Sequence, residues 1–218
     1  MLTEHRLSPL SGSAPKQVVI FLHGLGDRGD GGLLSICQMW QRALPDCEFL
    51  CPDAPFVFDM APPDFGGRQW FSLREFTPAS LEQGVIDAAP HMDAYIDHVL
   101  ATRNLPPEKL ALAGFSQGTM MALYVAPRRA GRVAGVLGYS GRLCGAARLK
   151  AEMKSAPPVL LAHGMEDEVV PFAAMAEAER GLTAAGIAVN TIACPNLGHS
   201  IDERGMVEGV RFLQACLA

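Results

Sequence analysis

The stretch Leu-Ala-Leu-Ala-Gly-Phe-Ser-Gln-Gly, residues 110–118, decides the fold of this 218-residue chain. It begins as a short apolar run, which is typical of a buried strand, and it ends in the pattern G-x-S-x-G around Ser116. A helical pattern follows over residues 117–126. A serine in this setting predicts a tight strand-to-helix turn that holds the hydroxyl above a sheet. The alternative is a turn serine that only caps the helix.

Apolar runs and helical patterns alternate over the rest of the chain as well. We expect strands at residues 18–22, 48–51, 110–113, 133–137, 159–162 and 189–193, and helices at 33–44, 81–99, 117–126, 172–185 and 206–217. Pro90 lies inside the second helical pattern and predicts a kink or a helix start. This alternation predicts a mostly parallel, doubly wound sheet flanked by helices in a single domain, 1–218, without a large separate lid domain. The long irregular segment 52–78 is typical of a site wall or lid.

Composition narrows the class of protein. Hydrophobic residues make up 49% of the chain and charged residues 19%, as in a globular protein, and the net charge of −5 argues against nucleic acid as a partner. Residues 1–15 are mixed and polar, and no apolar run approaches the ~20 residues of a membrane span, so we expect a cytoplasmic protein without stable membrane insertion.

The six scattered cysteines are expected to be buried thiols, and the close pair Cys47 and Cys51 leaves a redox role open. We expect neither a metal nor a cofactor.

A serine nucleophile needs an adjacent base, and an acid should orient that base. Two histidines follow Ser116, namely His163 and His199, and His199 lies after the last expected strand and before the last helix. This placement favours His199 as the base. The loop 163–171 offers three carboxylates, Glu166, Asp167 and Glu168, and the residues alone do not choose among them.

An oxyanion hole requires two backbone N–H groups that point at the developing negative charge. One is expected from Gln117, the residue after the nucleophile, and the other from Leu25 in the glycine-rich turn after the first expected strand. That turn could also have no catalytic part. Trp70, Phe71 and Leu73, together with Leu25, are candidate apolar walls for an acyl chain, and simple core packing is the alternative for the aromatic pair.

Taken together, these motifs resemble those of the phospholipase/carboxylesterase family, which includes acyl-protein thioesterases and small bacterial carboxylesterases. The matching segments are Phe21-Leu22-His23-Gly24-Leu25-Gly26-Asp27, Cys51-Pro52-Asp53-Ala54-Pro55, Gln69-Trp70-Phe71, Gly114-Phe115-Ser116-Gln117-Gly118, His163-Gly164 through Asp167 to Val170-Pro171, and Gly198-His199. The resemblance implies an α/β-hydrolase fold, a catalytic triad of Ser116, Asp167 and His199, and oxyanion donors at Leu25 and Gln117. The chain differs from the family pattern at Thr119, at Ser72 and over residues 140–144. These positions are expected to affect substrate preference more than the chemistry.

The expected activity is that of a serine carboxylesterase that hydrolyses short- to medium-chain acyl esters through an acyl-enzyme. An acyl-protein thioesterase or a lysophospholipase would use the same residues on a thioester or a lysophospholipid. A hydrolase scaffold that binds a ligand without turnover is the alternative from another class. A homodimer through exposed apolar surface also stays open.

Overall fold

The strand β2 (Gln17–Leu22) shows how this sheet is covered. Its side chains alternate between two hydrophobic cores: Val18, Ile20 and Leu22 pack on one side, and Val19 and Phe21 pack on the other. All five are fully buried. A strand that is apolar on both faces must have helices on both faces, as the sequence predicted.

The computed structural model describes residues 2–218 and contains a seven-stranded sheet in the order β1-β3-β2-β6-β7-β8-β9. Six strands run parallel: β2, β3 (Cys47–Pro52), β6 (Leu110–Phe115), β7 (Val136–Tyr139), β8 (Val159–Gly164) and β9 (Val189–Cys194). The edge strand β1 (Glu4–Leu7) pairs antiparallel with β3. This mostly parallel, doubly wound sheet confirms the predicted fold class.

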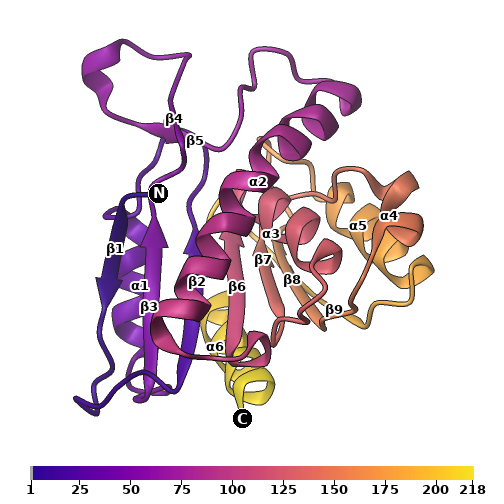
Figure 1. Cartoon of the computed structure of the whole chain (residues 1–218). Coiled ribbons are helices and arrows are strands. Elements are labelled where there is room, and N and C mark those ends of the chain that lie inside the picture. The colour runs from indigo at the N-terminus through magenta and orange to yellow at the C-terminus, as the bar shows by residue number, and fades with distance from the viewer. Residues whose placement is uncertain (1) are drawn as a thin grey trace.

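Helices cover both faces of the sheet (Figure 1). The helices α1 (Gly32–Trp40) and α6 (Glu203–Leu217) contribute to the core on one face. The other face carries α2 (Pro78–Arg103), α3 (Gln117–Arg128), α4 (Ala146–Glu152) and α5 (Ala173–Ala184). In Figure 1, β1 lies at one end of the molecule and α4 and α5 lie at the other.

Several boundaries differ from the sequence-based expectation. The strand β1 and the helix α4 were not predicted, and β7 begins at Val136 rather than at residue 133. Helix α2 runs unbroken through Pro90, so Pro90 does not start a helix; its ring lies on the exposed side of the helix. The segment 52–78 contains a small hairpin of β4 (Phe56–Val57) and β5 (Arg68–Gln69) and a 3₁₀ turn, Pro63–Phe65.

The topology places two loops next to each other at one edge of the sheet. The chain leaves β2 for β3 on one side and later returns to form β6 on the other side of β2. Leu22 at the end of β2 is paired in register with Gly114 near the end of β6. In open α/β sheets the crevice at such a switch point is where ligands bind. The residues after β2 and after β6 therefore face a common crevice.

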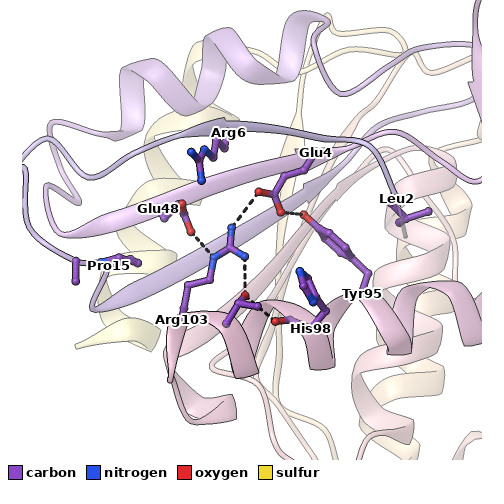
Figure 2. Close-up of a pocket in the computed structure, with 10 residues that line it drawn as sticks. Leu2, Glu4, Arg6, Pro15, Glu48, Tyr95, His98 and Arg103 are labelled. Carbon is purple, nitrogen blue, oxygen red and sulfur yellow. Dashed lines mark hydrogen bonds and ion pairs between the residues drawn. The ribbon is translucent and has the colours of Figure 1, made fainter.

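A cluster of buried charges attaches β1 and β3 to α2 (Figure 2). Arg103 at the end of α2 donates to Glu48 at 2.8 Å and to Glu4 at 3.0 Å, and the Tyr95 hydroxyl donates to Glu4 at 2.8 Å. Figure 2 shows the Arg103 guanidinium between the two carboxylates, with Tyr95 on the other side of Glu4. One guanidinium thus joins three elements at the edge of the sheet.

Among the described helices, none combines the length and the apolar character needed to cross a bilayer.

Candidate active site

Ser116 occupies a strained backbone position between β6 and α3. Its φ is 53° and its ψ is −115°, in the positive-φ region that side chains rarely adopt. A Cβ on Gly114 would lie 2.4 Å from the Gly118 backbone, and a Cβ on Gly118 would lie 2.1 Å from the Leu22 carbonyl oxygen. Both positions must therefore be glycine, as the turn demands. This geometry excludes an ordinary helix cap, because the Ser116 side chain makes no capping hydrogen bond.

The Thr119 side chain stabilises the turn through hydrogen bonds to the backbone. Its hydroxyl oxygen lies 2.7 Å from the Gly114 carbonyl oxygen and 2.8 Å from that of Tyr139, and it accepts the Tyr139 N–H at 3.0 Å. The side chain fits because its neighbours are small: a Cβ on Gly138 or Gly141 would lie within 2.6 Å of it. This departure from the family pattern is thus accommodated inside the fold.

His199 and Asp167 form a hydrogen-bonded pair. Nδ1 of His199 lies 2.8 Å from Oδ2 of Asp167, and the other carboxylate oxygen accepts the N–H groups of Val169 at 2.9 Å and Val170 at 2.8 Å. Burial opposes the charge of Asp167, but the hydrogen bonds from His199, Val170 and Val169 outweigh it and lower the pKa of that carboxyl below its usual value. Asp167 is therefore ionised and suited to stabilise a protonated imidazole.

The loops that carry this pair are packed tightly together. The Glu166 N–H donates to the Leu197 carbonyl at 2.9 Å, and a Cβ on Gly164 would lie 2.3 Å from the same carbonyl oxygen. The His199 ring lies against the ring of Phe115, with centroids 4.8 Å apart. Because Phe115 directly precedes Ser116, the imidazole stands beside the nucleophile turn, and its Nε2 is the nitrogen that Asp167 leaves available.

His163 contacts the same carboxylate from the interior. Its Nε2 donates to the Val170 carbonyl at 2.8 Å and lies 3.2 Å from Oδ2 of Asp167. His163 is buried, whereas Glu166 and Glu168 on the same loop are exposed. The structure therefore brings Asp167, and neither glutamate, into a hydrogen bond with His199.

Two unpaired N–H groups lie near Ser116. Within residues 2–218, neither the Leu25 N–H nor the Gln117 N–H donates a hydrogen bond to another group of the protein. A Cβ on Gly24 would lie 3.4 Å from Cβ of Ser116, so the turn that carries Leu25 approaches the nucleophile closely. Free donors on both sides of a nucleophile are what an oxyanion hole requires.

The three candidate wall residues have different environments. Trp70 is fully buried, and its indole N–H donates to the His23 carbonyl at 3.0 Å. Phe71 lines a groove of about 770 Å³ between the 56–77 segment and α2, and Leu73 is half-buried against the core. Contact of any of these side chains with an acyl chain stays a prediction.

Sequence analysis missed His23 and the side chain of Gln117 as structural parts of the site. The Gln117 side chain is buried, accepts the Trp70 N–H at 2.9 Å and donates to the Phe71 carbonyl at 2.7 Å. The signal for His23 was its place directly after β2, at the start of the glycine-rich turn.

Possible metal ligands also occur away from Ser116. Among the described residues, His5, Asp30 and Asp53 form the one such group, with ligand atoms within 4.8 Å of one another. Arg28 lies 3.1 Å from Asp30 and 3.7 Å from Asp53. These carboxylates thus already have a cationic partner within the chain.

Comparison with known proteins points to one family. A family model described as phospholipase/carboxylesterase matches residues 10–217. An acyl-protein thioesterase 1 of Aspergillus fumigatus is 30% identical, over 90% of this chain and 86% of its own. Esterase YpfH of Escherichia coli is 29% identical, over 88% of this chain and 79% of its own. The crystal structure of esterase PE8 superposes with a TM-score of 0.92 at 34% identity, and 99% of each chain is covered.

Proposed function

This chain belongs to the phospholipase/carboxylesterase family of α/β-hydrolases, and from that premise we propose that it cleaves short- to medium-chain acyl esters with Ser116 as nucleophile. It is a hydrolase of ester bonds, as its family and its esterase relatives are. The observation that carries the residue assignment is the His199–Asp167 hydrogen bond of 2.8 Å beside the strained turn of Ser116.

The reaction proceeds in two acyl-transfer steps. Ser116 Oγ attacks the ester carbonyl carbon while Nε2 of His199 takes the hydroxyl proton, and the carbonyl oxygen becomes an oxyanion held by the N–H groups of Leu25 and Gln117. When the tetrahedral intermediate collapses, the bond to the alcohol breaks and His199 returns the proton to the leaving oxygen. Water activated by His199 then hydrolyses the acyl-enzyme and frees Ser116. Asp167 holds the imidazole in the required tautomer throughout.

A second candidate activity is thioester cleavage, because a relative that covers most of this chain is an acyl-protein thioesterase. The same residues could also serve a lysophospholipase, since only the leaving group and the acyl chain differ. Values of kcat/KM for p-nitrophenyl esters of two to sixteen carbons, an acyl thioester and a lysophospholipid, measured in parallel, separate these substrates. The substrate class with the highest kcat/KM identifies the preferred reaction.

We also propose a cytoplasmic location, which the six free thiols among the described residues support, since such thiols persist in a reducing compartment. A homodimer is proposed only as a secondary feature. Exposed apolar side chains on the 56–76 segment, among them Phe56, Val57 and Phe65, offer surface for it. Sedimentation at several protein concentrations tests the dimer.

The variant Ser116→Ala tests the nucleophile. Alanine keeps the Cβ at the same backbone position, so the fold should be retained, while p-nitrophenyl butyrate hydrolysis should fall by on the order of 10⁴–10⁶-fold. Ser200→Ala, which alters an exposed serine beside His199, is the matched control and should keep wild-type activity.

A fluorophosphonate should label the wild type stoichiometrically and leave Ser116→Ala unlabelled. A folded Ser116→Ala protein with wild-type turnover would refute the assignment, and an unlabelled, inactive wild type would indicate a ligand-binding scaffold.

A further inference from the structure

The peptide between Gly24 and Leu25 is held from its carbonyl side. The Gly24 carbonyl oxygen lies 2.7 Å from Nδ1 of His23 and accepts the Asp27 N–H at 3.4 Å. In a trans peptide the C=O and the following N–H point in opposite directions, and the described residues contain no cis peptide bond. A donor that holds the Gly24 carbonyl therefore also fixes where the Leu25 N–H points.

The His23 ring has a defined tautomer. The Ala54 N–H donates to Nε2 of His23 at 2.9 Å, so Nε2 must accept and Nδ1 must carry the proton that goes to Gly24. The ring is completely buried. Burial lowers the pKa of His23 below its usual value and outweighs the hydrogen bond to Gly24 and the charges of Asp27 and Asp53, which act to raise this pKa. The neutral form that this arrangement needs is thus the form that the site favours.

Hydrogen bonds also connect His23 to Gln117, the residue with the other proposed oxyanion donor. The Gln117 side chain holds the Trp70 backbone N–H, and the Trp70 indole N–H donates to the His23 carbonyl. His23 in turn holds the Gly24 carbonyl through Nδ1. This chain of hydrogen bonds runs from one donor residue to the other, and neither the Leu25 N–H nor the Gln117 N–H takes part in it.

From this geometry we infer that His23 is a positioning residue, whose Nδ1–H fixes the Gly24–Leu25 peptide so that the Leu25 N–H faces the oxyanion. The inference rests on the proposed function, because it assigns His23 a part in that same reaction. Without this hydrogen bond, only the longer one from the Asp27 N–H, at 3.4 Å, holds the Gly24 carbonyl, so the Leu25 N–H is less firmly oriented. Removal of a whole oxyanion donor lowers kcat by about 10²–10³-fold, so a loosened donor should cost about 10–100-fold.

Two substitutions separate the two hydrogen bonds of the ring. In His23→Asn, the amide nitrogen stands where Nδ1 stood and can still donate to Gly24, but nothing reaches the Ala54 N–H. In His23→Gln, the amide oxygen stands near the position of Nε2 and can still accept from Ala54, but the donor to Gly24 is lost. We expect kcat for p-nitrophenyl butyrate to fall about 10–100-fold in His23→Gln and much less in His23→Asn, with similar KM values in both.

A boronic acid inhibitor gives a readout that loss of stability alone would not change. Phenylboronic acid adds to the serine oxygen and forms a tetrahedral adduct that mimics the oxyanion, so its Ki should rise in His23→Gln in proportion to the loss of kcat. The melting temperature of each variant is measured by circular dichroism, and all assays are run well below it. Equal losses in the two variants, or a larger loss in His23→Asn, would overturn the inference.

The outcome is separable from that of the proposed function. If Ser116→Ala is inactive and His23→Gln matches the wild type in kcat and Ki, the esterase assignment stands and the role of His23 is wrong. If Ser116→Ala keeps its activity, the proposed function itself fails.

Discussion

At the residue scale, geometry and not charge distinguishes the three carboxylates on the loop after β8. Asp167 is buried and receives two backbone N–H groups on one oxygen and the His199 imidazole on the other. Glu166 and Glu168 are its chain neighbours and point to solvent. A carboxylate orients an imidazole only when it is itself held in place, and only Asp167 meets that condition.

This difference predicts the effect of three substitutions. Asp167→Asn should lower kcat by about 10⁴-fold, because an amide in place of the carboxylate favours the wrong imidazole tautomer and no longer stabilises its charge. Glu166→Gln and Glu168→Gln are the matched controls and should stay within about twofold of the wild type, as expected of exposed surface positions. Steady-state kinetics with p-nitrophenyl butyrate measures all three. A large loss in a glutamate variant together with an active Asp167→Asn would move the acid to that glutamate.

The sequence led to most of these residues for a physical reason. Ser116 is recognisable because only glycines fit two positions before and after it, and His199 because so few histidines follow it. Asp167 could be chosen only through resemblance, since three adjacent carboxylates look alike until the loop is folded. His23 was missed because its function depends on hydrogen bonds to Gly24 and Ala54, and the latter lies 31 residues away.

At the element scale, the strands that are buried on both faces were predictable, and so was the edge strand β9, but the edge strand β1 and the short helix α4 were not. The strand β1 contains Glu4, His5 and Arg6, and a four-residue segment with so many polar residues carries no hydrophobic period. The seven residues of α4 make too few turns for a recognisable pattern. Helix α2 continued through Pro90 because the hydrophobic face on both sides of the proline packs on one core. Tertiary packing, which no local pattern records, decided these cases.

The buried ion cluster of β1, β3 and α2 makes a prediction about stability. Arg103→Met leaves the buried Glu48 and the partly buried Glu4 without their cation, so the free energy of unfolding should fall by about 3–5 kcal/mol. Lys16→Met removes a cation from an ion pair whose lysine side chain is 69% exposed, against 12% for Arg103, and should cost about 0–1 kcal/mol. Urea unfolding at equilibrium compares the two. Equal effects in both variants would show that the buried cluster contributes no more than a surface pair.

At the scale of the whole molecule, the two hydrophobic cores share one set of strands. Alternate residues of β2 belong to opposite cores, so neither core can come apart without disrupting the sheet that supports the other. We therefore propose that residues 1–218 form a single cooperative domain. The chain has two tryptophans, with Trp40 in one core and Trp70 in the other. The fluorescence of each indole can therefore report the unfolding of the core that contains it.

The proposal predicts coincident unfolding transitions. In Trp40→Phe and in Trp70→Phe, the remaining indole should report the same urea midpoint as far-UV circular dichroism of the same variant. The comparison within each variant cancels the destabilisation that the substitution itself causes. A fluorescence midpoint displaced from the dichroism midpoint in either variant would show that the two faces unfold separately.

The strained backbone of Ser116 lowers the stability of the fold while it places the hydroxyl for the proposed turnover. Its conformation belongs to a class that costs of order 1–3 kcal/mol and persists only because the glycines around it, Thr119 and the ends of β2 and β6 leave no alternative. If that residue relaxed to a comfortable conformation, the protein would gain stability and the hydroxyl would leave the crevice. Selection for stability alone is therefore expected to favour changes that relax the backbone at the proposed nucleophile, whereas selection for turnover would keep the strained conformation.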